Sequence, residues 1–302
     1  MSAQRAPLSE GRWHFQHGPI DIVIGADGRP DALQVSHAAA WERFRTVLDE
    51  LVGELAALRQ PVGADPCTLR GAVARRMWSA CRPYRADFIT PMAAVAGAVA
   101  QELIGHYARP GVDRAWVNNG GDIALYLAPG RSVRVGLYAD IARLDAAELR
   151  DGIRTDGWFD VRHESPVRGV ATSGWRGRSF SLGIADSVTV LARSAAEADA
   201  AATVIANAVD VDDPRIVRRP ARELKDDSDL GDLPVTVGVP CLDRETVRRA
   251  LESGLRCAQA LYERGLVWSC VLVCQGVIGR AGAHGGAAAG APQSAGAAAH
   301  AH

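Results

Sequence analysis

The sequence predicts an α+β fold, in which antiparallel-leaning strands form a sheet and the helices are segregated to one face of it. One observation is that short apolar segments follow each other across turn residues, as residues 13–15 and 20–24 do on either side of a Gly-Pro pair. The other is that segments with helical periodicity accompany these strands, and no repeat or linker divides them. We therefore expect one domain over residues 1–280 and a disordered Ala, Gly and His tail over residues 281–302.

Three segments of the N-terminal part differ in their helical signal. Residues 41–59 are predicted to form an amphipathic helix with the apolar stripe Trp41, Phe44, Val47, Leu48, Leu51, Leu55 and Leu58. Residues 60–90 are expected to be irregular, and their arginines either lean over an anionic ligand or are solvated: Arg70, Arg75, Arg76, Arg82 and Arg85. Residues 90–107 predict a helix rich in small residues, which ends before the next Pro-Gly pair.

The most informative run is Asn-Asn-Gly-Gly-Asp at residues 118–122, which lies between two apolar, strand-like stretches. One interpretation is a β-hairpin turn, which Asn-Gly strongly favours. The other is an anion site, because Gly120 and Gly121 can adopt positive φ and bring backbone N–H groups close to a ligand. Asp122 would then add a hydrogen-bond acceptor or a metal ligand at the same point. The local residues leave both interpretations open.

Downstream of this run, the patterns predict a short helix at 144–150, a small-residue turn at 171–174 and a buried strand at 187–191. A helix over 194–207 follows, and it opens with a capping box from Ser194 to Glu197. Asp199 and Thr203 are four residues apart on this helix, so they share one face. They either hold Mg²⁺ through oxygen ligands or lie where alanines allow close helix packing.

The C-terminal part is simpler. The acidic stretch 209–234 is expected to be a solvated loop, because its aspartates lack the spacing of an EF-hand. A strand at 234–239, a helix at 243–264 and a strand at 267–273 are predicted to follow and to close the domain.

The cysteines and histidines give no metal signature. The chain has six cysteines, and their spacing does not match a set of zinc-binding pairs. Cys270 and Cys274 lie four apart in the strand-like segment 268–276 and so on one face of it, and we expect them to be buried and reduced. His14 and His17 are assigned to surface positions of the first strand pair.

The composition fits a soluble protein of enzyme size and selects no single activity. The chain has 302 residues and a formal net charge of −1, so no charge surplus indicates nucleic acid or a membrane surface as a partner. No apolar run reaches the ~20 residues that a membrane-spanning helix needs. Residues 1–11 lack the apolar core of a signal peptide. We therefore expect a cytoplasmic protein with no nucleic-acid or membrane partner.

Four motifs in order, VNNGGDIA, GVATSG, SVTVLA and ADAAAT, resemble those of the ApbE family, and the resemblance covers about residues 84–209. That family consists of Mg²⁺-dependent FAD:protein FMN transferases, which cleave FAD and attach FMN to a threonine of a target flavoprotein. The resemblance implies a two-layer, T-fold-related arrangement, FAD and Mg²⁺ as ligands, and a flavoprotein as a partner. It also implies a strand at residues 132–138, where the family has a Trp-x-Val-Gly-Ile strand.

The resemblance also implies roles for individual residues. Those that match the motifs at the flavin nucleotide site are Asn118, Gly120, Gly121, Asp122, Thr172, Ser173 and Gly174. Asp199 and Thr203 match the metal ligands of the family. A backbone carbonyl near Val95 or Ala96 would also reach the metal.

The chain departs from the family pattern in three places. A Trp-Arg-Gly-Arg run stands where the family usually has an acidic-aromatic-Glu-Arg run after Thr-Ser-Gly. Ala96 stands where the family has a lysine, and no His-x-x-Asp-Pro motif follows the Thr-Ser-Gly run. Arg176 or Arg178 could supply the missing positive charge, or both could be exposed loop arginines. Asp122 and Asp186 are the two candidates for a catalytic base.

Two classes of function therefore stay open. One is a flavin enzyme, either an FMN transferase or an FAD pyrophosphatase. The other is a flavin- or nucleotide-binding protein that has lost the chemistry and serves as a carrier or interaction subunit. A purely structural relative without a ligand is a third, weaker alternative.

Overall fold

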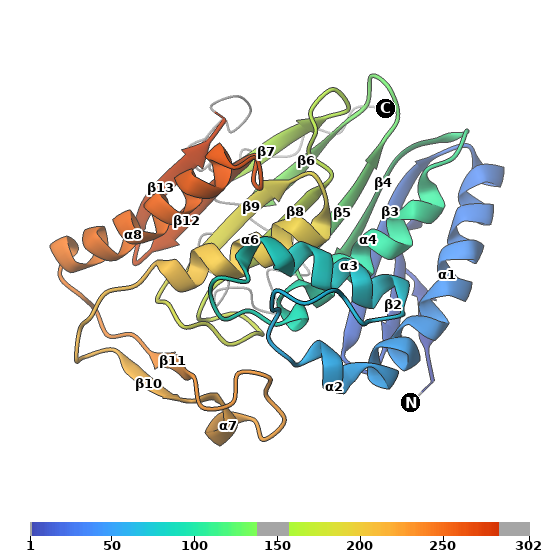
Figure 1. Cartoon of the computed structure of the whole chain (residues 1–302). Helices are drawn as coiled ribbons and strands as arrows, with labels where there is room; N and C mark the ends of the chain where they lie inside the picture. Colours follow the sequence, from blue (N-terminus) through green and yellow to red (C-terminus); the bar gives the residue numbers. More distant parts are fainter. Residues whose placement is uncertain (1, 138–156, 284–302) are drawn as a thin grey trace.

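A nine-stranded antiparallel sheet forms the centre of the computed structural model, which describes residues 2–137 and 157–283 (Figure 1). Neighbouring strands in the sheet follow chain order except where β6 and β7, and later β10 and β11, leave it. In order across the sheet, the strands are β1 (Gln4–Pro7), β2 (Trp13–His17), β3 (Ile20–Gly28), β4 (Val112–Asn119), β5 (Asp122–Leu127), β8 (Gly169–Ser173), β9 (Ser187–Ala192), β12 (Ser269–Cys274) and β13 (Val277–Gly282).

The longer helices cover one face of this sheet (Figure 1). They are α1 (Pro30–Gly53), α3 (Ala72–Cys81), α4 (Val95–Ile104), α6 (Ala195–Ala208) and α8 (Arg244–Glu263). Shorter helical pieces are α2 (Leu55–Leu58), η1 (Ser9–Gly11), η2 (Arg82–Tyr84), η3 (Pro91–Ala94) and η4 (Gly105–Tyr107). Side-chain caps fix the starts of two of the helices, since Ser194 accepts from the Glu197 amide and Asp243 accepts from the Thr246 amide.

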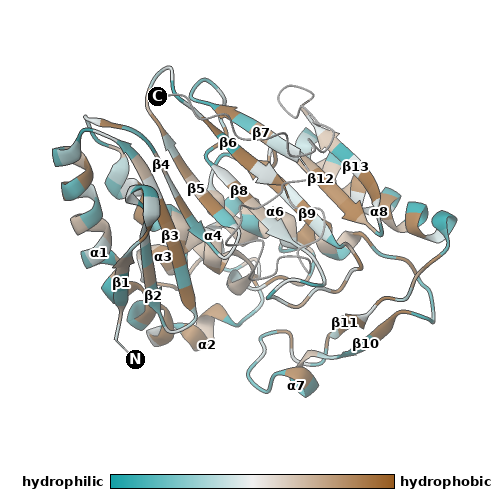
Figure 2. Cartoon of the chain, turned by 180° about the vertical axis from the view of Figure 1, so that it is seen from behind, coloured by the Kyte–Doolittle hydropathy of each residue, from teal (hydrophilic) through white to brown (hydrophobic). Residues whose placement is uncertain are grey.

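A hairpin of β6 (Ser132–Leu137) and β7 (Gly157–Arg162) lies over the opposite face (Figure 2). It forms a second, smaller core with the sheet, composed of Leu125, Leu127, Val135, Phe159, Val161, Val167, Val170, Leu191, Val271 and Val273. Strand β9 therefore has a core on each side, and all six of its residues are buried. This double burial explains why β9 carries no charged residue, and its two polar residues, Ser187 and Thr189, are buried with the apolar ones.

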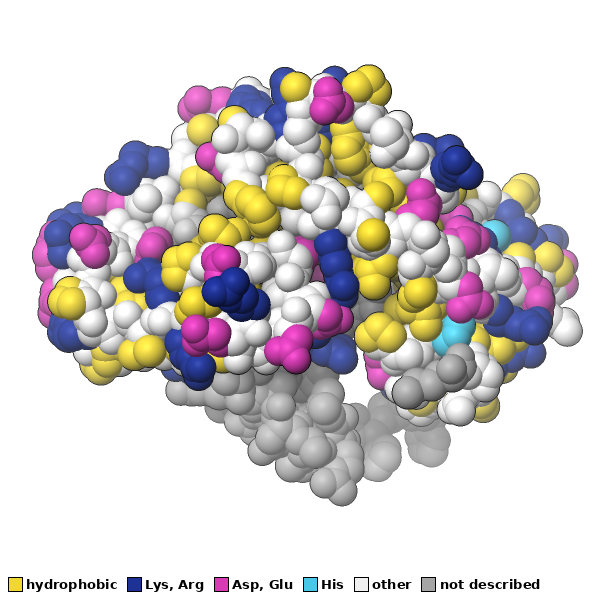
Figure 3. Space-filling model, turned by 60° about the horizontal axis from the view of Figure 1, so that its bottom comes forward, with side chains coloured by type: hydrophobic (Ala, Val, Ile, Leu, Met, Phe, Trp, Pro, Cys, Tyr) yellow, Lys and Arg dark blue, Asp and Glu magenta, His cyan; other side chains and the backbone are white. Residues whose placement is uncertain are grey.

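A second excursion, called the arm here, comprises β10 (Val217–Pro220), α7 (Ala221–Leu224) and β11 (Pro234–Gly238) with the loop between them (Figure 1). Two polar contacts join its loop to the body: Asp227 pairs with Arg59 at 2.8 Å, and Asp229 accepts a hydrogen bond from the buried Thr90 hydroxyl. Positive and negative side chains are interspersed over the face shown in Figure 3. The arm contributes such pairs, including Arg222 with Asp232 at 2.9 Å.

The α+β class and most of the predicted elements are confirmed. Strands β2 and β3 pair as expected, and β6, β9, β11 and β12 lie where strands were predicted. The predicted helices at 90–107, 194–207 and 243–264 correspond to η3–α4–η4, α6 and α8. Cys270 and Cys274 are buried free thiols on β12.

Two helical predictions were wrong in the N-terminal part. Helix α1 begins at Pro30, eleven residues before the predicted start, because Pro30 is well suited to the first helical turn and Asp31 follows it. Residues 60–90 are not irregular throughout, since α3 occupies 72–81. Its apolar stripe was hidden among arginines: Val73, Ala74, Met77, Ala80 and Cys81 are buried.

Other predictions also need correction. Thr172 and Ser173 belong to strand β8, so the predicted turn begins only at Gly174. The acidic stretch contains β10 and α7, and β13 was not predicted at all. His17 is buried at 5% exposure, because its strand packs under α1 and its ring lies 6.3 Å from that of Phe44.

Some expectations fall beyond the structural description. The helix predicted at 144–150 and most of the tail lie outside the described residues. Strand β13 ends at Gly282, inside the range expected for the tail. In the part of the chain that is described, no helix is both long enough and apolar enough to cross a bilayer.

Candidate functional site

The β4–β5 hairpin closes through a two-residue turn, Gly120-Gly121, with Asn119 and Asp122 paired across it. Both glycines have positive φ, 67° and 113°, so the turn depends on the lack of a side chain at these positions. The Asn118 side chain accepts a hydrogen bond from the Gly121 N–H at 2.8 Å. The hairpin interpretation is therefore correct, and one of the turn's amides is already used inside the protein.

Asp122 starts β5 directly after this turn and is buried. Its Oδ1 accepts a hydrogen bond from the backbone N–H of Thr172 on the neighbouring strand β8, at 3.3 Å. Asp199 approaches from helix α6, and its Oδ2 accepts from the backbone N–H of Gly97 at 2.9 Å. Gly97 lies in the first turn of α4, where unpaired amides and the helix dipole favour a negative charge. A strand end and two helix starts thus converge on a pair of carboxyl groups.

Both carboxyl groups are harder to ionise than usual. Burial raises the pKa of Asp122 well above its ordinary value, and the charge of Asp199 raises it further. Burial also raises the pKa of Asp199 to about 7, against the opposing effect of the Gly97 and Ala96 amides. Neither carboxyl group has an ion-pair partner among the described residues. Such a pair can share a proton or accept a cation.

The close approach of α4 to α6 depends on small residues. A Cβ atom on Gly97 would lie 2.3 Å from the backbone oxygen of Ala195 and 2.9 Å from Cβ of Asp199. On the other side, the Asn119 side chain donates a hydrogen bond to the Ala96 carbonyl at 3.1 Å. Of the two carbonyls that the family resemblance names, that of Ala96 is therefore held by Asn119. Thr203 follows one turn later on α6 and is partly buried.

Strand β8 connects this centre to its neighbour β9. The Thr172 hydroxyl is hydrogen-bonded to that of Thr189 at 3.0 Å, and its amide binds Asp122. Ser173 is partly buried at the end of the strand. Gly174 passes close to the next segment, since a Cβ there would lie 2.5 Å from the backbone oxygen of Asp186.

The structure gives Asp186 and Arg176 contacts of a different kind. The buried Asp186 carboxylate accepts a hydrogen bond from the backbone N–H of Gln275, in the turn between β12 and β13. Gln275 has a positive φ of 43°, which this hydrogen bond helps to hold. Arg176 Nε lies 3.8 Å from Asp186 Oδ1. These contacts favour a structural role for Asp186, and its catalytic role stays a prediction.

Asn119 and Gly97 contribute to the centre and were not singled out from the sequence. The period of a strand offers a signal for Asn119, because Ala115, Val117 and Asn119 alternate and all three are buried. An amide at the buried end of that row is unusual enough to attract attention. No comparable signal marks Gly97, whose importance comes from a helix about a hundred residues away in the chain.

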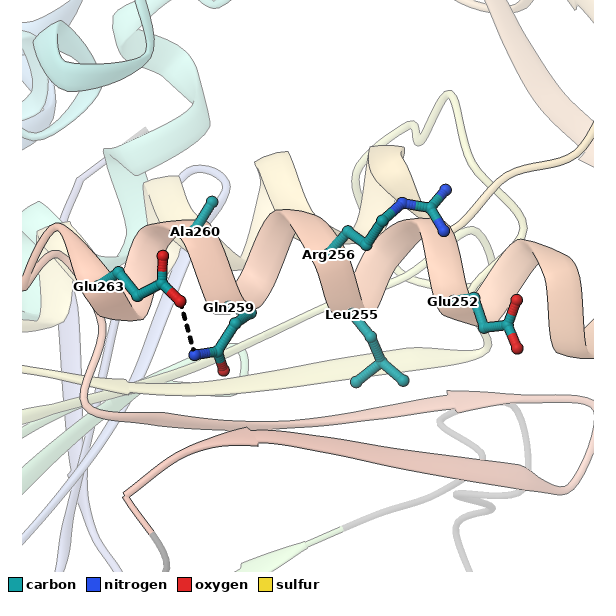
Figure 4. A pocket seen from close by; sticks show the side chains of 6 residues that line it. All are labelled: Glu252, Leu255, Arg256, Gln259, Ala260 and Glu263. Atoms are coloured by element: carbon teal, nitrogen blue, oxygen red, sulfur yellow. Dashed lines mark hydrogen bonds between the residues drawn. The ribbon is translucent and has the colours of Figure 1, made fainter.

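A groove of about 430 Å³ lies elsewhere, along α8 (Figure 4). The side chains that line it all come from this one helix: Glu252, Leu255, Arg256, Gln259, Ala260 and Glu263. Gln259 donates a hydrogen bond to Glu263 at 3.0 Å, and no residue named by the motifs takes part. Within the described ranges, no cluster of three or more His, Cys, Asp or Glu side chains could hold a metal ion by itself.

Comparison with known proteins gives a family match over nearly the whole chain and relatives over part of it. A family model described as AbpE bacteria matches residues 4–283. A UPF0280 protein of Methanopyrus kandleri is 40% identical over 219 residues, which cover 70% of this chain and 80% of that protein. A UPF0280 protein of Methanothermobacter thermautotrophicus is 40% identical over 158 residues, or 52% of this chain and 56% of the relative.

Solved structures give a weaker likeness. The apo form of the flavinyl transferase ApbE of Pseudomonas stutzeri is 14% identical, with a TM-score of 0.45 and coverage of 92% of this chain and 94% of that one. An ApbE protein of Thermotoga maritima is 13% identical, with a TM-score of 0.44 and coverage of 92% and 96%.

Proposed function

This chain belongs to the AbpE bacteria family, and from that premise and the geometry of its site we propose that it binds a flavin nucleotide, FAD, together with Mg²⁺. We further propose that it cleaves the pyrophosphate of FAD and transfers FMN to a threonine of a target flavoprotein. Without a protein acceptor, water would take the place of the threonine and the protein would act as an FAD pyrophosphatase.

The observation that carries the proposal is the pair Asp122 and Asp199. Two acidic side chains meet beside the start of α4 and the tip of the β4–β5 hairpin, and neither has an ion-pair partner in the described part of the chain. Leaving such groups uncompensated costs stability, because burial disfavours their charged forms. A ligand that brings positive charge would remove this cost. That expectation fits a cation with an anionic nucleotide better than it fits an apolar ligand.

The donor atoms suit Mg²⁺. Asp199 offers a carboxylate, Thr203 a hydroxyl one turn later, and Ala96 a backbone carbonyl on the facing helix start. These are hard oxygen ligands, and Mg²⁺ usually completes its shell with water and phosphate oxygens. When bound, the ion would neutralise charge on the pyrophosphate.

The reaction requires a proton acceptor as well as positioning. The P–O–P bond of FAD breaks, AMP leaves, and a new ester bond joins the FMN phosphorus to the threonine oxygen. The hydroxyl proton must pass to a base, and a carboxylate whose pKa is raised toward neutrality accepts it more readily. We assign this role to Asp122, because burial and Asp199 raise its pKa and because it lies beside the proposed metal ligands. Asn118, Gly120, Gly121 and the Thr172–Gly174 segment would contact the nucleotide.

A second function, nucleotide binding without chemistry, is favoured by one observation. Ala96 occupies the helix start where the family resemblance expects a lysine, so α4 presents a methyl group in place of a cation there. Binding could survive this loss, because the proposed metal ligands and the hairpin are retained. Turnover would suffer more, since phosphoryl transfer depends on neutralising charge in the transition state.

An assay of bound flavin and released AMP separates these functions. Purified protein is mixed with FAD and Mg²⁺, with and without EDTA, and an Asp199→Ala variant is compared with a Glu197→Gln control on the exposed side of the same helix. AMP release that stops with EDTA and in Asp199→Ala supports the enzyme. Tight flavin binding without AMP supports the binding protein. Unchanged AMP release from Asp199→Ala would refute the metal assignment, and no flavin binding at all would refute both functions.

A further inference from the structure

The loop that follows β8 carries two arginines, and the structure separates their roles. Arg176 lies with its guanidinium 5.0 Å from the ring centre of Trp175 and its Nε 3.8 Å from Asp186. It is therefore engaged by an aromatic ring and a carboxylate of the protein. Arg178 turns toward a different element, since its Nη1 lies 3.4 Å from the position that a Cβ on Gly120 would occupy.

Arg178 is exposed and reaches the tip of the β4–β5 hairpin. With other described residues it forms no ion pair and no hydrogen bond. A Cβ on Gly120 would be in ordinary van der Waals contact with Nη1, so the guanidinium lies directly beside the turn. Asp122 is only two residues further along the chain, so the cation lies beside the proposed nucleotide site.

Few other groups at the site can donate hydrogen bonds or positive charge to an anion. One of the turn's backbone N–H groups, that of Gly121, already donates to Asn118, so the hairpin alone offers few donors to an anion. Helix α4 supplies no cation at its start, because Ala96 stands there. A guanidinium has a planar fork of N–H donors that can bind phosphate oxygens in pairs, and such charge-assisted bonds are among the stronger ones.

We propose that Arg178, and not Arg176, binds the phosphate oxygens of the nucleotide above the Gly120-Gly121 turn. This inference rests on the proposed function for the identity of the ligand, a flavin nucleotide. It assigns the recognition of the anionic part to a side chain that neither the family match nor the relatives identify. Binding of the flavin ring is not expected to depend on Arg178.

The test is a set of binding titrations that vary the charge of the ligand. Riboflavin, FMN, FAD and inorganic pyrophosphate, each with Mg²⁺, are titrated into the full chain by calorimetry. The variants are Arg178→Ala, Arg178→Lys and, as a matched control, Arg280→Ala, an exposed arginine on β13 that likewise forms no ion pair with described residues. Thermal unfolding of each variant verifies that the fold is intact.

We expect Arg178→Ala to weaken the binding of FAD, FMN and pyrophosphate about tenfold or more, as the loss of a charged hydrogen bond would. The affinity for riboflavin should stay unchanged. Arg178→Lys should recover part of the loss, and Arg280→Ala should match the wild type. If Arg178→Ala lost equal affinity for riboflavin and FAD, or lost no affinity at all, the inference about Arg178 would be overturned. The proposed function would still stand in that case, because the wild type binds FAD. Pyrophosphate binding that depends on Arg178 without any flavin binding would refute the proposed function and keep the anion site. A wild type that binds neither would refute both.

Discussion

Replacing Asp199 with asparagine should change how the stability of the protein depends on pH. Asparagine keeps an oxygen that can accept the hydrogen bond from Gly97 and removes the group that titrates. The pKa of Asp199 is about 7 in the folded protein, against 3.8 for an exposed aspartate. The folded state therefore holds a proton that the unfolded state has lost between these two values. The contribution of this proton to the unfolding free energy is at its full value below pH 3.8, and it is lost as the pH rises through 7.

The size of the effect follows from the two pKa values. Each unit of difference is worth about 1.4 kcal/mol, and the titration between pH 5 and pH 7 accounts for about 2 kcal/mol of unfolding free energy. Urea unfolding without metal, measured at half-unit steps over this range, should show the wild type losing that amount relative to Asp199→Asn. The comparison removes contributions that both proteins share. Glu197→Gln, on the exposed side of α6, should follow the wild type.

Mg²⁺ extends the same experiment to the proposed metal site. At pH 8 the ion should stabilise the wild type by about 1.5 to 3 kcal/mol at ten to a hundred times its dissociation constant, and it should leave Asp199→Asn unchanged. A difference curve that is flat between pH 5 and pH 7 would refute the description of Asp199 as a partly buried carboxyl group with a raised pKa. Equal stabilisation of both proteins by Mg²⁺ would refute its role as a metal ligand.

Three further predictions concern the surroundings of the site. Gly97→Ala should destabilise the protein by about 1–3 kcal/mol in urea unfolding, because its Cβ would lie 2.3 Å from a backbone oxygen at the start of α6. Gly105→Ala is the control and should change stability little, because a Cβ there meets nothing within 4 Å. Similar losses for the two variants would contradict this packing. Asn119→Ala should free the Ala96 carbonyl and weaken Mg²⁺-dependent FAD binding several-fold by calorimetry, and unchanged binding would show that the amide only fills space. Phe159→Ala should cost about 3–5 kcal/mol, because this ring is buried in the second core; a loss below 1 kcal/mol would mean that the hairpin packs loosely on the sheet.

Local signals in the sequence were sufficient for much of the fold. Turn glycines, strand alternation and helix caps act over a few residues, so the β4–β5 hairpin, β9 and the capped start of α6 could be predicted without knowledge of their neighbours. The prediction failed where the signal was mixed. Arginines masked the apolar stripe of α3, and a run of small residues made part of β8 look like a turn.

For the candidate site, the sequence by itself determined which groups are available: the motif order, Asp122, Asp199 and the glycines that allow tight approach. Only the tertiary structure decided which of them meet. Three contacts at the site join residues that are far apart in the sequence: Asp199 with Gly97, Asn119 with Ala96, and Arg178 with the Gly120 turn. The first two pairs are 102 and 23 positions apart, and the third joins two separate loops, so no local sequence pattern predicts these contacts. The same packing removes water from two carboxyl groups and so raises their pKa values. The sequence specifies the type of each side chain, whereas the proximity and desolvation of these groups arise only when α4, α6 and the central strands pack together.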